Sequence, residues 1–250
     1  MPTSETPSLP LTGERTVPGI AHENYWFRRH EAVYAAIAPE CSGVVLEAGC
    51  GEGYGADLLA GGARRVLALD YDTATVTHVA CRYPRVAAAR ANLVALPVAT
   101  GSVDAVVSLQ VIEHLWEQER FLAECLRVLR PGGRLLVSTP NRLTFSPGRD
   151  TPLNPFHTRE LAPDELERMV ATAGFSGVRV QGLSHGPRLR ALDRAHRGSV
   201  VDAQTAVVLS GSPWPPALLA DVAAVRSCDF VLHSRELDRS LDLLVTARRP

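Results

Sequence analysis

Residues 44–55 read VVLEAGCGEGYG, and this stretch decides the fold. It starts as a short, mostly apolar run of the kind that forms a strand buried on both faces. Gly49, Gly51 and Gly53 follow at alternate positions, which allows the strand to turn tightly into a helix while a ligand approaches the backbone. The spacing is E-x-G-x-G-x-G, which differs from the G-x-G-x-x-G of dinucleotide-binding proteins. We therefore expect a strand, a ligand-binding turn and a helix here.

Outward from this turn, short apolar runs alternate with helical segments. The alternation predicts a mostly parallel sheet with helices on both faces. A helix is also expected over residues 22–38, and the PGG triplet at 131–133 predicts a break between a helix and the next strand. The remaining strands are expected at 65–70, 103–109, 133–140, 177–183 and 240–248, and the remaining helices at 53–60, 73–82, 118–129 and 163–173.

The pattern predicts one domain over residues 23–250, preceded by a Pro- and Ser-containing N-terminal extension over residues 1–22. After residue 183 the alternation stops. Residues from about 184 to 227 are expected to form a helical insertion before the last strand. This insertion either binds substrate or forms a dimer contact, or it consists of additional helices that cover the sheet.

The composition excludes several classes of protein. The 250 residues are 46% apolar and 21% charged, which excludes a disordered chain. No apolar run approaches the roughly 20 residues of a membrane span, and no secretion signal is recognisable. The net charge of −1 argues against a nucleic-acid partner, and the five cysteines show no disulfide or metal spacing. We expect a cytoplasmic protein with neither a membrane nor a nucleic-acid partner.

A second predicted strand ends at Asp70, 17 residues after Gly53, where a carboxylate can accept hydrogen bonds from both hydroxyls of a ribose. Together with LDYD at 69–72, the long segment at 91–117 and LRVLRPGGRLLVSTPN at 126–141, the glycine turn resembles the class I S-adenosylmethionine-dependent methyltransferases. The resemblance covers roughly residues 25–183. It implies a Rossmann-like α/β fold whose sheet is seven-stranded and mostly parallel, and it implies S-adenosylmethionine as the cofactor.

The resemblance assigns cofactor contacts position by position. The glycines of the turn would line the methionine part, Asp70 would hold the ribose and Tyr71 would pack near the adenine. Asn92 stands where the family usually has an aspartate, so the adenine amine would meet an uncharged amide. The implied cofactor residues are Tyr25, Arg29, His30, Glu47, Gly49, Gly51, Gly53, Asp70, Tyr71, Asn92, Leu93 and Gln110. The first three resemble an aromatic and basic lid helix, and an amphipathic surface helix is the alternative.

Methyl transfer to a hydroxyl needs a base or a metal, because a neutral alcohol attacks a sulfonium slowly. Glu113 and His114 follow one predicted strand, and His157 lies on the loop after the next. They resemble the site of metal-dependent relatives with E-x-x-E-H and a later histidine, although Gln110 replaces the first glutamate here. Three interpretations stay open. The three residues bind Mg²⁺ or another divalent cation, or His114 or His157 acts as a metal-free general base, or all three are structural.

Further segments, among them LTGERTVPG at 11–19 and HGPRLR at 185–190, resemble a family of actinobacterial sugar 1-O-methyltransferases. In mycobacteria these block the reducing end of 3-O-methylated mannosides during methylmannose polysaccharide biosynthesis. The resemblance implies a mannoside acceptor, for which Trp116 and Trp214 are candidate stacking surfaces. The alternatives are an O-methyltransferase for a quinone or phenol, an RNA 3′-end methyltransferase, and a non-catalytic cofactor-binding subunit. A homodimer is also open.

Overall fold

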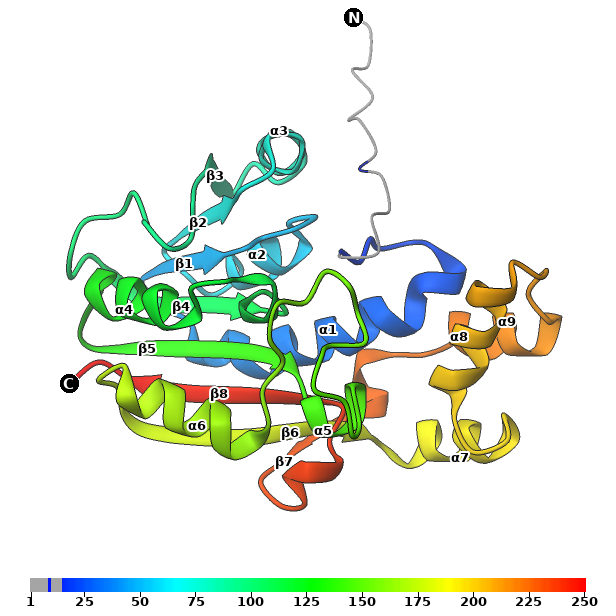
Figure 1. Cartoon of the computed structure of the whole chain (residues 1–250). Helices are drawn as coiled ribbons and strands as arrows, with labels where there is room; N and C mark the ends of the chain where they lie inside the picture. Colours follow the sequence, from blue (N-terminus) through cyan, green and yellow to red (C-terminus); the bar gives the residue numbers. More distant parts are fainter. Residues whose placement is uncertain (1–8, 10–14) are drawn as a thin grey trace, which may run out of the picture.

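The computed structural model describes residue 9 and residues 15–250, so residues 1–8 and 10–14 of the predicted extension lie outside the described residues. Within the described part, one sheet of eight strands has the order β3-β2-β1-β4-β5-β8-β6-β7 (Figure 1). The strands are β1 (Val44–Ala48), β2 (Arg65–Asp70), β3 (Val86–Arg90), β4 (Val103–Leu109), β5 (Leu129–Pro140), β6 (Ser176–His185), β7 (Phe230–His233) and β8 (Asp242–Arg248).

The strands β3, β2, β1, β4 and β5 run parallel to one another, as the alternation of strands and helices predicts. The strand β8 is antiparallel to both of its neighbours, β5 and β6, and β7 is antiparallel to β6. The helices are α1 (Asn24–Ile37), α2 (Tyr54–Leu59), α3 (Thr73–Arg82), α4 (Gln118–Val128), α5 (Arg142–Phe145), α6 (Pro163–Thr172), α7 (Pro187–Ala195), α8 (Val200–Ser210) and α9 (Pro216–Ala223), with single 3-10 turns at η1 (Ala21–Glu23), η2 (Ala38–Glu40), η3 (Ile112–His114), η4 (Ser227–Asp229) and η5 (Leu237–Arg239).

Both faces of the sheet are buried because successive side chains of each strand point in opposite directions. Val45 of β1 belongs to the hydrophobic core that contains residues of α1, α2 and α3, whereas the next residue, Leu46, belongs to the core that contains residues of α4 and α6. Neighbouring β4 alternates in the same way, with Ala105 in the first core and Val106 in the second. These two cores explain why the strands read as continuous apolar runs in the sequence.

The predicted fold is confirmed, with differences of detail. Every strand and helix predicted by range is present, and the predicted insertion contains α7, α8 and α9. The described sheet has one strand more than the seven expected, since the short segment β7 adds an edge strand. The PGG triplet lies inside β5, where the pairing with β4 jumps from Val103–Leu129 to Ala105–Arg134. The break therefore interrupts the register of β5 after α4 has ended.

The carboxyl ends of the parallel strands meet at one edge of the sheet, which is the edge where ligands bind in open α/β folds. The turn after β1, the end of β2 and the 3-10 turn η3 after β4 all lie there. Among the described residues, no helix is long and apolar enough to span a membrane.

Candidate active site

The turn after β1 depends on glycines with left-handed backbone angles. Gly53 has a φ of +98°, and a Cβ there would lie 2.7 Å from Cγ2 of Val79 in α3, so this position requires glycine for packing. Gly51 has a φ of +51°, and a Cβ there would have no atom within 4 Å. Gly53 thus serves the fold, whereas Gly51 borders open space that a ligand can approach.

Two backbone N–H groups hold the carboxylate of Asp70 at the end of β2. Oδ2 accepts from the Gly51 N–H and Oδ1 accepts from the Asp72 N–H, each at 3.0 Å. Each carboxylate oxygen has a further lone pair, so Asp70 can also accept from a pair of neighbouring hydroxyls. Beside it, Tyr71 is 68% exposed and the guanidinium of Arg90 lies 5.0 Å from its ring centroid. An open aromatic face therefore stands next to the fixed carboxylate.

These residues border a cavity of about 460 Å³, which we call the glycine-loop cavity. The amide of Asn92, at its border, is ordered because Oδ1 accepts from the Val94 N–H at 3.1 Å. The residues predicted to contact the cofactor that line this cavity are His30, Gly49, Gly51, Asp70, Tyr71, Asn92, Leu93 and Gln110. The structure thus brings the predicted ribose, adenine and methionine contacts to one place.

The structure does not bring Tyr25 and Arg29 to the glycine-loop cavity. Tyr25 is fully buried, and its hydroxyl lies 2.6 Å from Nε2 of His185. The Arg29 guanidinium makes two hydrogen bonds of 2.6 Å to the carboxylate of Asp242. Tyr25 and Arg29 are four positions apart and share the face of α1 that packs against the domain. The expectation that these two side chains contact the cofactor from a lid helix is therefore not met in the glycine-loop cavity. The helical pattern of the sequence does not say which face of α1 is buried.

Glu47 and Gly53 also lie off the lining of the glycine-loop cavity. Glu47 is fully buried, and Oε1 accepts from the Tyr34 hydroxyl at 2.6 Å. Burial raises the pKa of Glu47 to about 8. Since Tyr34 does line the cavity, Glu47 shapes the wall from behind.

His30, the third residue of the predicted lid helix, does line the cavity. Burial lowers the pKa of His30 to about 4, so its imidazole is neutral at physiological pH. Nδ1 lies 3.4 Å from the hydroxyl of Thr16. His30 therefore offers hydrogen bonding and an aromatic edge, without the positive charge that the lid-helix resemblance implies.

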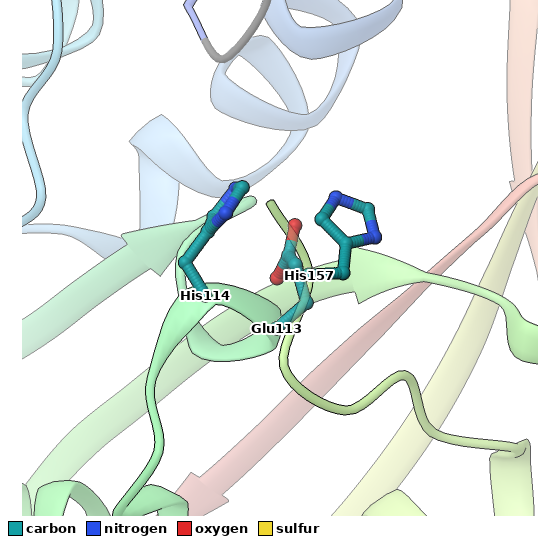
Figure 2. A group of neighbouring side chains, drawn as sticks. All are labelled: Glu113, His114 and His157. Atoms are coloured by element: carbon teal, nitrogen blue, oxygen red, sulfur yellow. The ribbon is translucent and has the colours of Figure 1, made fainter. Parts of the chain in front are cut away.

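Glu113, His114 and His157 come together beyond the end of β4. Glu113 and His114 lie on η3, whereas His157 lies on the loop that follows α5. Figure 2 shows the carboxylate of Glu113 between the two imidazole rings. One ligand atom from each residue lies within 4.8 Å of the other two. The three residues that the sequence proposes as a metal or base site are therefore neighbours.

Backbone contacts tie the His157 loop to η3. The Thr158 N–H donates to the Glu113 carbonyl at 2.7 Å. Nε2 of the buried Gln118 donates to the carbonyls of Ile112 and Arg159, each at 2.9 Å. These bonds explain how segments more than 40 residues apart in the chain present their side chains to one point.

The carboxylate of Glu113 is only 1% exposed, and Oε2 accepts from the Thr139 hydroxyl at 3.0 Å. Burial raises the pKa of Glu113 to about 8. A positive charge brought beside this carboxylate would favour its ionised form.

Hydrogen bonds place a proton on Nδ1 of both imidazoles. Nδ1 of His114 lies 3.1 Å from the Phe156 carbonyl oxygen, which can only accept, so Nδ1 carries a proton. The Phe156 N–H donates to Oδ1 of Asn154 at 3.0 Å, which turns Nδ2 of Asn154 toward Nε2 of His157, also at 3.0 Å. Nδ1 of His157 lies 2.7 Å from Oε1 of Glu160. Both rings thus carry a proton on Nδ1, and His157 carries its lone pair on Nε2.

A second cavity, of about 340 Å³, is lined by Glu113, His114 and His157 together with Trp26, Trp214 and residues of α8. We call it the α8 cavity. The described residues that line both cavities are Arg15, Thr16, His30, Gln110 and His114. Because the two cavities share these residues, they adjoin, and a group held in one can meet a group held in the other.

The sequence did not predict three further residues at or beside the site: Arg15, Thr16 and Glu160. Nη2 of Arg15 donates to the Asp72 carboxylate at 3.0 Å, and the Thr16 hydroxyl lies 2.9 Å from the Tyr54 hydroxyl. The stretch that holds Arg15 and Thr16 has no apolar periodicity, and its single signal is the LTGERTVPG resemblance. Glu160 is noticeable in the sequence only as an acid three residues after His157.

The sequence of this chain is similar to known methyltransferases. A family model described as a methyltransferase domain matches residues 46–137. A protein of Mycolicibacterium smegmatis named a probable S-adenosylmethionine-dependent methyltransferase is 60% identical over 254 residues, which cover 100% of this chain and 99% of the relative. A ubiquinone biosynthesis O-methyltransferase of Cupriavidus pinatubonensis is 29% identical over 163 residues, 57% of this chain and 64% of the relative.

The crystal structure of a SAM-dependent methyltransferase from Thermotoga maritima has the same fold. Its TM-score is 0.62 at 17% identity, and the match covers 92% of this chain and 91% of that one. The likeness of fold agrees with the sheet order and the glycine turn described above. The identity and coverage of the M. smegmatis relative decide the family. The chain belongs to the S-adenosylmethionine-dependent methyltransferases.

Proposed function

We propose that this chain transfers a methyl group from S-adenosylmethionine to the 1-hydroxyl of a 3-O-methylated mannoside. The observation that carries the proposal is the position of Glu113, His114 and His157 on the wall of the α8 cavity, beside the glycine-loop cavity. Activation of a hydroxyl requires a base or a metal ion, and a carboxylate with two imidazoles can supply the base or hold the metal.

The residues of the glycine-loop cavity fit S-adenosylmethionine. The fixed carboxylate of Asp70 suits the ribose hydroxyls, and the exposed ring of Tyr71 suits the adenine. Gly51 has no side chain and allows a ligand to reach the backbone. When bound, the cofactor supplies an electrophilic methyl group on a sulfonium.

His157 is placed to take the proton of an acceptor hydroxyl. Its Nε2 lone pair is on a residue that lines the α8 cavity, where Asn154 supplies the present hydrogen-bond donor. An acceptor hydroxyl can replace that donor and pass its proton to Nε2 as its oxygen bonds to the methyl carbon and the carbon–sulfur bond breaks. The chain thereby holds the two reactants together and takes up the released proton.

As the alternative to a metal-free base, we propose that Glu113, His114 and His157 hold Mg²⁺ or another divalent cation, in which case Nε2 of His157 would bind the cation and would not take the proton. A carboxylate oxygen and two imidazole nitrogens form a borderline oxygen and nitrogen donor set. The buried Glu113 carboxylate forms no ion pair with an arginine among the described residues, so a cation would compensate it. A bound cation supplies Lewis acidity that lowers the pKa of the acceptor hydroxyl.

The α8 cavity has a mixed lining that suits a partly methylated sugar. Its lining includes the aromatic residues Trp26 and Trp214 and the amide residue Asn154. Val208 and Leu209 on α8, also in the lining, are 64% and 82% exposed. A methylated sugar presents both apolar C–H and methyl surface and hydroxyl groups, so both kinds of lining have a counterpart. Trp116, the other predicted stacking residue, lines neither described cavity.

A phenol or quinol is the second candidate acceptor. The same cavity has three aromatic side chains, Trp26, Phe145 and Trp214. Its two arginines, Arg15 and Arg29, already pair with aspartates, which leaves the lining less polar than its composition indicates. The similarity to a ubiquinone biosynthesis O-methyltransferase also favours this class.

Methyl transfer from labelled cofactor to 3-O-methylmannose and its short oligosaccharides tests the proposal, with catechol as the rival acceptor. We expect transfer to the sugars. Transfer to catechol alone would replace the sugar by the second candidate. Transfer that EDTA abolishes and Mg²⁺ restores would support the cation, whereas transfer that EDTA leaves unchanged would leave His157 as the base.

The variant His157→Ala tests the assignment of the cluster. We expect it to lose turnover and to bind S-adenosylhomocysteine as the wild type does, because His157 lines only the α8 cavity of the two. A rate close to that of the wild type would show that His157 takes no part in the transfer.

A further inference from the structure

We infer that Glu160 is a positioning residue, which acts through Nδ1 of His157 to hold the imidazole with its Nε2 lone pair toward the α8 cavity. The inference rests on the proposed function, because it requires that His157 act at Nε2. Glu160 itself lines neither cavity, and it contacts the lining through His157.

Glu160 has a buried carboxylate that forms a hydrogen bond with the side chain of His157. The residue is 3% exposed, and Oε1 accepts from Nδ1 of His157 at 2.7 Å. Oε2 is buried and has no hydrogen-bond partner among the described residues. Burying a carboxylate is costly unless it is paired, and here the imidazole is the pairing group. The buried carboxylate of Glu160 thus stands where it can fix a residue of the site.

The neighbouring arginine does not relieve Glu160. Arg159 lies next to it in the chain, but Nη1 of Arg159 pairs with the exposed Glu119 at 3.0 Å. Among the described residues, neither Glu160 nor the buried Glu113 forms an ion pair with an arginine. Two buried carboxyl groups, those of Glu113 and Glu160, therefore lie beside His157.

Contacts at the two nitrogens of His157 agree with each other. Glu160 requires a proton on Nδ1, and the Asn154 amide, which donates toward Nε2, requires a lone pair there. The ring of Phe145 lies 5.3 Å from the imidazole centroid at an angle of 31° and limits its rotation. The ring is thus preset in the tautomer that accepts a proton or binds a cation at Nε2.

Two variants of Glu160 test the inference. Glu160→Met removes both carboxylate oxygens and keeps a side chain of similar length. Glu160→Gln keeps one oxygen but removes the charge. For Glu160→Met we expect kcat to fall by about 10- to 100-fold, with the acceptor KM and the affinity for S-adenosylhomocysteine unchanged. Glu160→Gln should fall between this variant and the wild type, and it carries the test if Glu160→Met does not fold. Glu119→Gln, which alters the surface partner of Arg159, is the matched control and should retain the wild-type kcat.

The tautomer of His157 can be measured directly. It would not change in the Glu160 variants if Glu160 had only a structural role. Long-range ¹H–¹⁵N correlation spectra of the wild type should show a protonated Nδ1, and Glu160→Met should show a mixture of tautomers. A wild-type kcat in both variants, or a lower kcat with an unchanged tautomer, would overturn the inference. The spectra need no acceptor. A wild type that methylates no sugar would therefore refute the proposed function, while the tautomer would still decide the role of Glu160.

Discussion

The guanidinium of Arg29 in α1 and the carboxylate of Asp242 in β8 form a buried ion pair through two hydrogen bonds of 2.6 Å. The partners are 213 positions apart in the chain. Nη2 of Arg29 also donates to the Leu241 carbonyl at 3.1 Å. The pair fixes α1 against the sheet, and α1 carries His30, which lines both cavities.

Asp242→Asn would leave the charge of Arg29 buried and without its counter-ion. We expect the free energy of unfolding to fall by about 3 kcal/mol, the typical cost of breaking a buried pair by removing one partner. Urea titration measures this change. Asp164→Asn, which alters the exposed pair with Arg168, is the control and should leave stability unchanged. Equal stability of the two variants would contradict a structural role for the buried pair.

Asp70→Ala should weaken cofactor binding. It removes the carboxylate that the Gly51 and Asp72 N–H groups hold at the end of β2. Hydrogen bonds to a charged group contribute about 1.5–3 kcal/mol, so we expect the Kd for S-adenosylhomocysteine to rise by roughly 10- to 100-fold. Isothermal titration calorimetry gives this value directly. Asp57→Ala, at a surface aspartate that pairs with Arg85, should bind as the wild type does.

Two glycine-to-alanine changes in one turn should separate folding from binding. Gly53→Ala places a methyl group 2.7 Å from Val79 at a φ of +98°, so we expect a loss of about 1–3 kcal/mol in stability. Gly51→Ala points into open space at a φ of +51°, and it should cost less stability while it weakens cofactor binding. Thermal unfolding and calorimetry on both proteins test this. Gly51→Ala with the larger loss of stability and unchanged binding would reverse the assignment.

Glu47→Gln should change how stability depends on pH. Burial raises the pKa of Glu47 from 4.5 to about 8 in the folded state. The carboxyl group therefore binds a proton more tightly when folded, and its contribution is fully present below pH 4.5 and is lost as the pH rises through 8. The stability of the wild type relative to Glu47→Gln should fall between pH 5 and 8, by at most about 1.4 kcal/mol per pH unit. Urea titrations across this pH range give the free energy of unfolding of both proteins. A constant difference between the wild type and Glu47→Gln would refute the prediction.

The order of strands and helices followed from the sequence because the two buried faces of β1 and β4 leave continuous apolar runs. Two strands, β3 and β7, were not predicted by range from the sequence. The segment 86–90, VAAAR, has few large apolar residues, and only Val86 is buried. The segment 230–233 spans only four residues at the edge of the sheet, where one buried side chain, Phe230, gives no periodic signal. Short or edge strands depend on their partners, which a single sequence does not reveal.

The site was predictable where side chains follow strand ends and not where they depend on packing. Asp70, Glu113 and His157 are on the lining or in the cluster expected of them. Tyr25 is not, because the helical pattern of α1 leaves open which face meets the sheet. Arg15 lines both cavities from a stretch without regular secondary structure. Neither a hydrophobic period nor a secondary-structure propensity therefore identifies it in the sequence. Contacts of this kind are set by tertiary structure alone.

The position of β8 has a consequence for the protein during synthesis. This strand lies between β5 and β6, although it follows all seven other described strands in the chain. Until residues 242–248 leave the ribosome, β6 and β7 have no strand through which to join the sheet, β5 keeps an open edge, and α1 lacks the counter-ion of Arg29. An unpaired strand edge is a site of aggregation. We therefore expect the nascent chain to be most prone to aggregation just before β8, the last described strand, emerges.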